Sequence, residues 1–259
     1  SFSGGFGIDK NSPMGARTLF GRFDLHQNSQ NMMSKSSGFI SLKSDHLLGS
    51  ELCATCHNLY TQYVLEDGTF SEEWFAEQTP YTEWLNSDFA TQSTCQDCHM
   101  PAAEGNVSLS SMGPGGPRSP FATHGFVGGN VYMLGVLKDF GGELDVQANV
   151  EHYDATIERT LNNLQSNTAE LRISDPIVED SQLSFDVATN NLTGHKLPTG
   201  YPSRRVWLHV TVEDENGQVV FESGAAEENG TIAGNDNDAD SQAYEAHYNE
   251  ITSSDQVQI

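Results

Sequence analysis

All four cysteines of this 259-residue chain lie in two segments with the same spacing, Cys53-Ala54-Thr55-Cys56-His57 and Cys95-Gln96-Asp97-Cys98-His99. Two thiols at positions i and i+3 lie on one side of a helical turn, so both can reach the two vinyl groups of a single porphyrin. The histidine at i+4 then lies beneath the ring and can offer an imidazole nitrogen to iron. We therefore predict two covalently bound c-type haems. The thioethers are expected at Cys53, Cys56, Cys95 and Cys98, and the proximal iron ligands at His57 and His99.

Two other kinds of site use paired cysteines. A Cys₄ zinc site could be built from the same two pairs, but 38 residues separate Cys56 from Cys95, which is longer than the usual spacing. The histidine that follows each pair would also have no role there. A thioredoxin-like dithiol needs one Cys-x-x-Cys beside a βαβ pattern, which this sequence lacks. The haem interpretation therefore leads.

The charge balance is strongly acidic, with 36 Asp and Glu against 12 Lys and Arg and a net charge of −24. A nucleic-acid partner is excluded on this ground, because phosphate binding requires basic side chains. The acidic surface fits either a solubility shell or a face that steers a basic redox partner, and charge alone does not separate them.

No apolar run approaches the roughly 20 residues of a membrane span. The segment 1–6 has neither the basic nor the apolar region of a signal peptide. Since haem is attached outside the cytoplasm, we expect a periplasmic or extracellular protein whose leader has been removed or whose sequence is an excised piece.

The pattern of apolar residues changes along the chain and predicts an α+β fold. Residues 1–45 are rich in Gly, Ser and Asn and are expected to be mostly irregular, and 104–120 reads as a loop. Helices are predicted over 46–63, 81–89, 126–137 and 150–164. After Asn167 the apolar residues alternate, and Asn216-Gly217 between two alternating runs indicates a hairpin.

These elements suggest two domains. We expect a loop-rich α-helical dihaem domain over residues 1–169. We expect a C-terminal antiparallel β-sandwich-like domain over residues 170–259. The alternating end of the chain, at Ile259, suggests that this second domain is truncated.

Seven histidines remain for the distal side of the two irons, and no methionine is well placed, since Met100 directly follows His99. Bis-His ligation is therefore favoured. His124 lies in a glycine-rich segment that allows close backbone approach, His195 lies in a proline-stiffened loop, and His46 lies shortly before the first motif. Of the others, His152 is expected to be solvated and His209 structural, while His26 and His247 stay undecided.

An acidic segment offers a different site. Asp236, Asp238 and Asp240 alternate with other residues, as ligands of hard cations do, so calcium is one interpretation. No Gly follows Asp240 and no Glu closes the loop, so a solvated acidic turn is the other.

Five segments together resemble bacterial multihaem cytochromes c of the family that contains the tetrahaem cytochromes of nitrifiers and related respiratory octahaem proteins. The segments are 50–58, 78–85, 95–101, 124–130 and 194–200. The resemblance implies extracytoplasmic electron transfer between closely spaced bis-His haems, and it favours His124 and His195 as distal ligands. Such relatives usually carry more than two haems, and their sequences extend past both ends of this one.

The leading hypothesis is an electron carrier, rather than an enzyme, that passes electrons between a quinol-oxidising membrane module and a terminal acceptor. Its partners would be other redox proteins or further haem domains. The alternatives are a haem reductase of a small nitrogen or sulfur oxyanion, or a haem-bearing docking module. A reductase needs an open iron and basic residues, and Lys196 with Arg204-Arg205 forms the only basic cluster.

Overall fold

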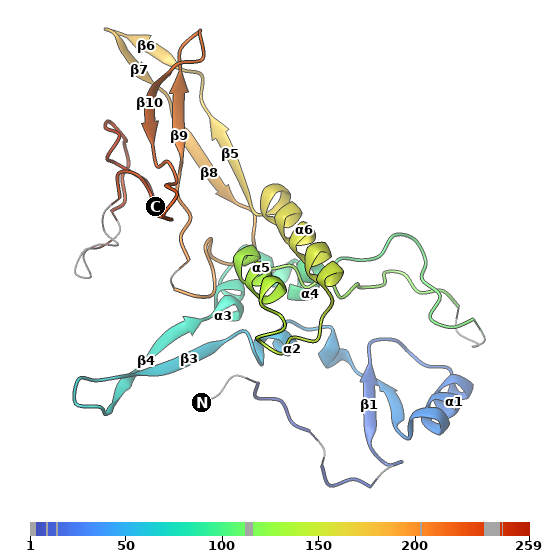
Figure 1. The fold of residues 1–259 in the computed structure, drawn as a ribbon. Coiled ribbons are helices and arrows are strands. Elements are labelled where there is room, and N and C mark those ends of the chain that lie inside the picture. Colours follow the sequence, from blue (N-terminus) through green and yellow to red (C-terminus); the bar gives the residue numbers. More distant parts are fainter. Residues whose placement is uncertain are drawn as a thin grey trace. The chain divides into compact units, whose positions relative to one another are not determined.

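The structure is a computed structural model that describes residues 4–8, 10–13, 15–111, 116–202, 204–235, 244 and 246–259. It contains both helices and antiparallel strands, as the α+β prediction requires (Figure 1). Residue contacts divide the chain into two units, Ser1–Gly200 and Tyr201–Ile259. This division falls later in the chain than the 169/170 boundary expected from the change in pattern, because the first strands after Asn167 belong to the first unit.

The first unit begins with a strand–helix–strand segment. Strand β1 (Thr18–Gly21) pairs in parallel with β2 (Ile40–Lys43), and helix α1 (Gln27–Ser37) connects them. The helix begins at His26, whose Nδ1 accepts a hydrogen bond from the Asn28 amide, and ends at Gly38 with φ of 75°. Residues 1–45 are therefore more regular than their composition suggested, because end-capping groups define a helix with little apolar content.

Short helices carry the two cysteine motifs and the chain between them. They are η1 (Asp45–Leu47), α2 (Glu51–Ala54), α3 (Pro80–Leu85), η2 (Asp88–Thr91) and α4 (Cys95–His99). Helix α3 begins at Pro80, whose missing N–H would have no partner in a first helical turn. Together α3 and η2 confirm the helical prediction for 81–89.

A long hairpin separates the first motif from α3. Strands β3 (Leu59–Val64) and β4 (Phe70–Gln78) pair antiparallel and lead through a turn at Gly68, which has φ of 82° (Figure 1). The prediction of one helix over 46–63 is therefore wrong beyond the first motif. Aromatic and β-branched residues dominate β3, and these favour strands when a partner strand is present.

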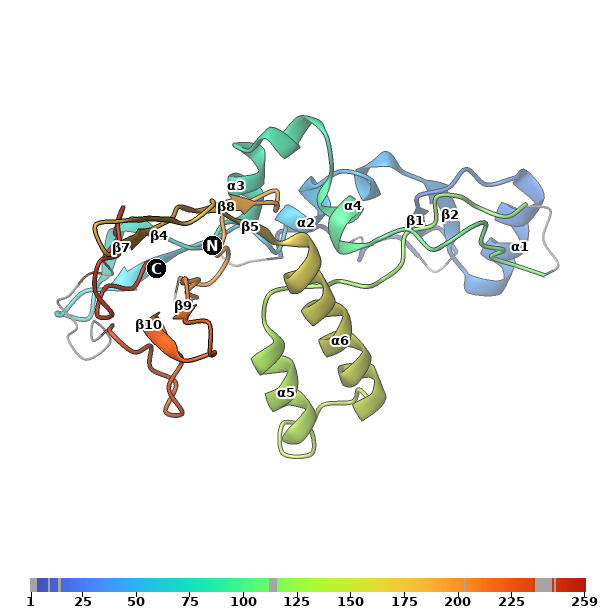
Figure 2. The same ribbon diagram turned by 90° about the horizontal axis from the view of Figure 1, so that it is seen from above.

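Two helices form an antiparallel pair later in the first unit. They are α5 (Val131–Asp139) and α6 (Val150–Asn167), and they lie side by side in Figure 2. The Lys138 ammonium lies 3.0 Å from the Asp154 carboxylate and links them. The helix predicted over 150–164 is confirmed, and the one predicted over 126–137 begins later than expected.

The remaining strands form two-stranded ladders within the described residues. In the first unit β5 (Ala169–Ile173) pairs with β8 (Val187–Asn191), and β6 (Ile177–Glu179) pairs with β7 (Gln182–Ser184). In the second unit β9 (Val210–Glu213) pairs with β10 (Val219–Ser223) across the predicted Asn216-Gly217 turn, where Gly217 has φ of 77°. All three pairs are antiparallel, while a sandwich of packed sheets stays a prediction.

The described residues of the first unit form no buried apolar core. Among its described residues every buried side chain is polar: Ser41, Ser50, Ser71, Thr160 and Thr168. The buried apolar side chains, Ile232 and Val257, belong to the second unit. No helix within the described residues is long and apolar enough to cross a membrane.

Candidate haem-binding site

The first motif is held by a single helical turn. Cys53 lies in α2, and its carbonyl accepts hydrogen bonds from the Cys56 amide at 3.1 Å and from the His57 amide at 2.9 Å. The Thr55 hydroxyl donates to the Leu52 carbonyl at 2.7 Å. The two thiols and the imidazole thus leave one turn in the order that attachment to one porphyrin requires. The His57 side chain is exposed.

The second motif forms a capped helix of its own. Thr94 precedes α4, and its amide and hydroxyl both donate to the Asp97 carboxylate, at 2.7 and 2.9 Å. This reciprocal capping box satisfies N–H groups that a helix start otherwise leaves without partners. The start of the helix that carries the second motif is therefore stabilised by local hydrogen bonds.

The two motifs meet at buried Ser50, just before α2, which is 1% exposed. Its hydroxyl accepts a hydrogen bond from the Cys95 amide at 3.1 Å. The Gln96 side chain donates to the Gly49 carbonyl at 2.8 Å and to the Leu47 carbonyl at 3.3 Å. The start of α4 is thus docked on the segment that begins α2.

This docking places the first cysteine of each motif side by side. As free thiols, Cys53 and Cys95 share a hydrogen bond, and this bond lowers the pKa of Cys95 to about 6. Burial of Cys95 acts in the opposite direction and raises its pKa. The same hydrogen bond, followed by burial, raises the pKa of Cys53. Burial also raises the pKa of Cys98. The two attachment sites are therefore neighbours, although 41 residues separate Cys53 from Cys95 in the chain.

His99 and His195 lie close together in this arrangement, with nearly parallel ring planes. Their ring centroids are 6.2 Å apart, with 24° between the ring planes. The His99 Nδ1 donates to the Val127 carbonyl at 2.7 Å, and the His195 Nδ1 donates to the Lys196 carbonyl at 3.0 Å. A backbone carbonyl can only accept, so both Nδ1 atoms carry a proton, and the neutral form of each ring has its lone pair on Nε2.

The centroid distance of this pair agrees with the distance expected for two imidazoles that would share one transition metal. A bound imidazole nitrogen lies about 2.0 to 2.1 Å from a transition metal, and a ring nitrogen lies about 1.2 Å from the ring centroid. Two imidazoles on opposite sides of one metal then have centroids about 6.4 Å apart, close to the observed 6.2 Å. Ligating histidines also characteristically donate their other N–H to a carbonyl or carboxylate. Burial is the main cause that lowers the pKa of His195, and a lower pKa favours the neutral ring, which is the form that ligates metals.

Apolar side chains around the motifs also fit a large planar group. Leu52 in α2 is 40% exposed, Leu85 in α3 is 54% exposed, and Phe126 beside His99 is 61% exposed. Covering apolar surface stabilises a fold by about 25 cal/mol per Å². A porphyrin would provide that cover in a unit whose described side chains form no apolar core.

The other predicted ligands are not paired in this way. His124 is exposed with its ring 5.5 Å from Phe126, and His46 shares a hydrogen bond of 2.6 Å with the Ser44 hydroxyl. Both stay predictions as distal ligands. Among the described residues no group of three or more His, Cys, Asp or Glu side chains could hold a metal ion. The calcium candidates Asp236, Asp238 and Asp240 lie outside the described residues.

The remaining histidines have local roles. The His26 ring caps α1, and Gln258 shares a 3.3 Å hydrogen bond with His247. His152 is exposed on α6, as expected. His209 lies just before β9 and contacts the Glu222 carboxylate at 2.9 Å, which agrees with a structural role.

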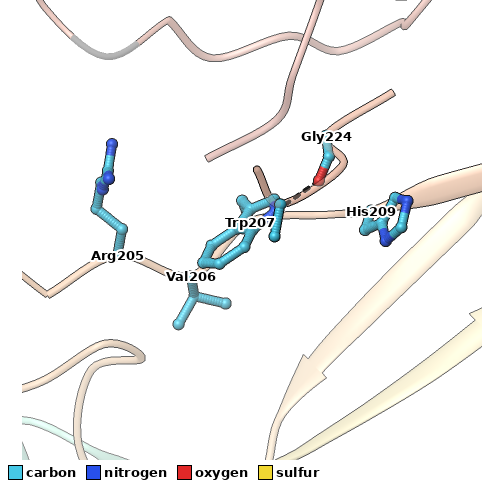
Figure 3. Close-up of a pocket in the computed structure, with 6 residues that line it drawn as sticks. Arg205, Val206, Trp207, His209 and Gly224 are labelled. Atoms are coloured by element: carbon cyan, nitrogen blue, oxygen red, sulfur yellow. Dashed lines mark hydrogen bonds between the residues drawn. The ribbon is translucent and has the colours of Figure 1, made fainter. Parts of the chain in front are cut away.

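The second unit contains a pocket, whose lining residues are drawn in Figure 3. The Trp207 indole N–H donates to the Gly224 carbonyl at 2.9 Å, which Figure 3 shows as a dashed line. Gly224 has φ of 78°, and a Cβ there would lie 2.4 Å from the Leu208 carbonyl oxygen, so only glycine fits. No motif residue lines this pocket, whose lining is Arg205, Val206, Trp207, His209, Gly224 and Ala226.

The sequence matches no protein-family model, and no curated protein matches it. Among solved structures it is similar to a penta-haem cytochrome c552 from Thermochromatium tepidum, with 18% identity and a TM-score of 0.46. The match covers 80% of this chain and 43% of the cytochrome, so the chain spans less than half the length of that protein. This TM-score is too low to establish a shared fold.

Proposed function

We propose that this protein is an extracytoplasmic electron-transfer cytochrome of the multihaem c type, with two covalent haems. The observation that carries the proposal is the His99–His195 pair, with ring centroids 6.2 Å apart and both Nδ1 atoms donating to backbone carbonyls. It supports an iron closed on both sides by imidazole at the second motif. Since one iron takes one distal ligand, His124 or His46 would serve the first haem.

The residues of the chain would attach, orient and insulate the haems. Haem would supply a one-electron iron couple, and His99 and His195 would hold the iron of the second haem through their imidazole nitrogens. Contact between Cys53 and Cys95 would place the edges of the two haems close together. A short path between two closed irons suits electron carriage.

The acidic character of the chain supports a basic partner or a basic neighbouring haem domain. A net charge of −24 gives strong attraction to positively charged proteins, and this attraction weakens as salt is added. We propose that residues 1–169 attach both haems through their thioethers and proximal histidines, that 170–259 form a second domain whose first part supplies the distal His195, and that the protein acts in the periplasm or outside the cell.

The test of this function is haem content together with carbon monoxide binding. Denatured protein should retain two haems per chain by mass and by the pyridine haemochrome spectrum. The reduced native protein should stay low-spin and bind no carbon monoxide. Zinc in place of haem would overturn the proposal, and stoichiometric carbon monoxide binding at one haem of the full-length protein would favour the reductase.

A further inference from the structure

The loop that carries His195 is fixed at its first end by β8. The Asn191 side chain donates to the His195 carbonyl at 2.7 Å, and it accepts from the Thr193 amide and hydroxyl at 2.9 and 2.7 Å. These contacts define the chain up to His195. They do not hold the rest of the loop, which extends to Gly200.

The second half of the loop is held by one carboxylate from a distant part of the chain. Half-buried Glu83 in α3 accepts from the Lys196 amide at 3.0 Å and from the Thr199 hydroxyl at 2.6 Å, both at Oε2. Its other oxygen, Oε1, accepts from the Thr79 hydroxyl at 3.4 Å. Hydrogen bonds to an ionised acceptor are stronger than those between neutral groups. Glu83 therefore clamps both sides of the Leu197-Pro198 turn.

The loop also packs directly on the segment that leads to the second motif. A Cβ at Gly194 would lie 3.3 Å from Trp84 Cδ1 and 3.4 Å from Phe89 Cβ, so the backbone approaches α3 and η2 closely. The Trp84 indole donates to the Ser93 carbonyl at 3.0 Å, next to the Thr94 cap of α4. One segment thus supports both the loop of His195 and the helix of His99.

We propose that Glu83 is a positioning residue for the second haem, whose carboxylate fixes the 193–200 loop on α3 and so holds His195 opposite His99. This inference rests on the proposed function. Glu83 also brings a negative charge close to His195. That charge favours the ferric over the ferrous state of a nearby iron, so it should lower the reduction potential of the second haem.

Two substitutions separate the clamp from the charge. Glu83→Ala removes both the clamp hydrogen bonds and the negative charge. Hydrogen exchange at the Lys196 amide should therefore accelerate by on the order of tenfold. In a fraction of the molecules, the second haem should become high-spin. Glu83→Gln keeps an amide oxygen that can accept both hydrogen bonds. It should therefore stay low-spin, while the potential of one haem shifts to more positive values.

Glu72→Gln on β4 is the matched control, because Glu72 is exposed and forms no hydrogen bond or ion pair with the described residues of the loop. It removes one carboxylate and should change neither the spin state, the potential nor the Lys196 exchange. An equal potential shift in Glu72→Gln and Glu83→Gln would overturn the local charge contribution. If Glu83→Ala does not fold, Thr199→Val removes one of the clamp hydrogen bonds, and an unchanged Lys196 exchange rate there would overturn the clamp.

His195→Ala distinguishes failure of the clamp from failure of the function. If His195→Ala turns one haem high-spin while Glu83→Ala keeps native spectra and Lys196 exchange, Glu83 is not a positioning residue but the ligand pair stands. If His195→Ala itself leaves both haems low-spin, the proposed ligand pair is wrong and the clamp has no haem to act on.

Discussion

The two Cys-x-x-Cys-His segments have identical spacing, yet their surroundings hold them differently. At the second motif, a capping box fixes α4, the Val127 carbonyl orients the His99 ring, and His195 faces it. At the first motif, the Ser50 side chain caps no N–H of α2, and the His57 ring is exposed. The spacing therefore predicts where each haem would be attached, while residues far away in the chain would supply the distal ligand of its iron.

The largest expected difference between the two motifs concerns the distal ligands. His195→Ala should convert only the second haem to high-spin, because His195 faces His99 and no other proximal ligand. His124→Ala should leave the second haem low-spin, and if His124 is a ligand it should convert the first. Absorption and electron paramagnetic resonance spectra of the single and double variants would show this. If both single variants converted the same haem, the two motifs would not take their distal ligands from different histidines, as proposed.

The next effect concerns the junction of the two motifs. Ser50→Ala leaves the buried Cys95 amide without its partner, which should lower the free energy of unfolding by about 1–3 kcal/mol. Ser36→Ala, at an exposed position in α1, is the control and should change stability by less than about 0.5 kcal/mol. Chemical denaturation of the haem-loaded proteins measures both. Equal losses in the two variants would show that the junction contributes nothing specific.

A smaller effect is expected at the start of the second motif. Thr94→Ala removes one half of the capping box and should lower the free energy of unfolding by about 0.5–2 kcal/mol. The haem content should stay at two per chain, since no ligand or thioether changes. Thermal unfolding followed at a haem absorption band would measure the loss. A stability equal to that of the unsubstituted protein would mean that haem attachment alone fixes α4.

The smallest effect is expected at the corresponding threonine of the first motif. Thr55 is half-buried and donates to the Leu52 carbonyl at 2.7 Å, without capping a helix start. Thr55→Ala should therefore change stability by no more than about 0.5 kcal/mol. The same thermal measurement serves, paired with Thr94→Ala. A loss larger than that of Thr94→Ala would reverse the order of rigidity inferred for the two motifs.

Several parts of the fold could be predicted from the sequence because their causes are local. Helix α6 follows from apolar residues at intervals of three and four, and the β9–β10 hairpin follows from Asn216-Gly217. The β3–β4 hairpin was missed, because short apolar runs near a motif helix also fit a helical period. Only pairing with β4, which follows in the chain, decides that Leu59–Val64 is a strand.

The sequence by itself carries the prediction of covalent haem attachment at the candidate site. Two thiols and a histidine at fixed spacing lie on one helical turn wherever that turn is placed, so Cys53, Cys56, Cys95 and Cys98 needed no tertiary information. The presence of a histidine in the sequence, in contrast, does not show which other residues lie near it in the fold. Tertiary structure alone brought His195 to His99, Ser50 to Cys95 and Glu83 to Lys196. These contacts join residues that are 45 to 113 positions apart in the chain. No local sequence pattern encodes contacts over such distances, because they depend on how the intervening segments pack.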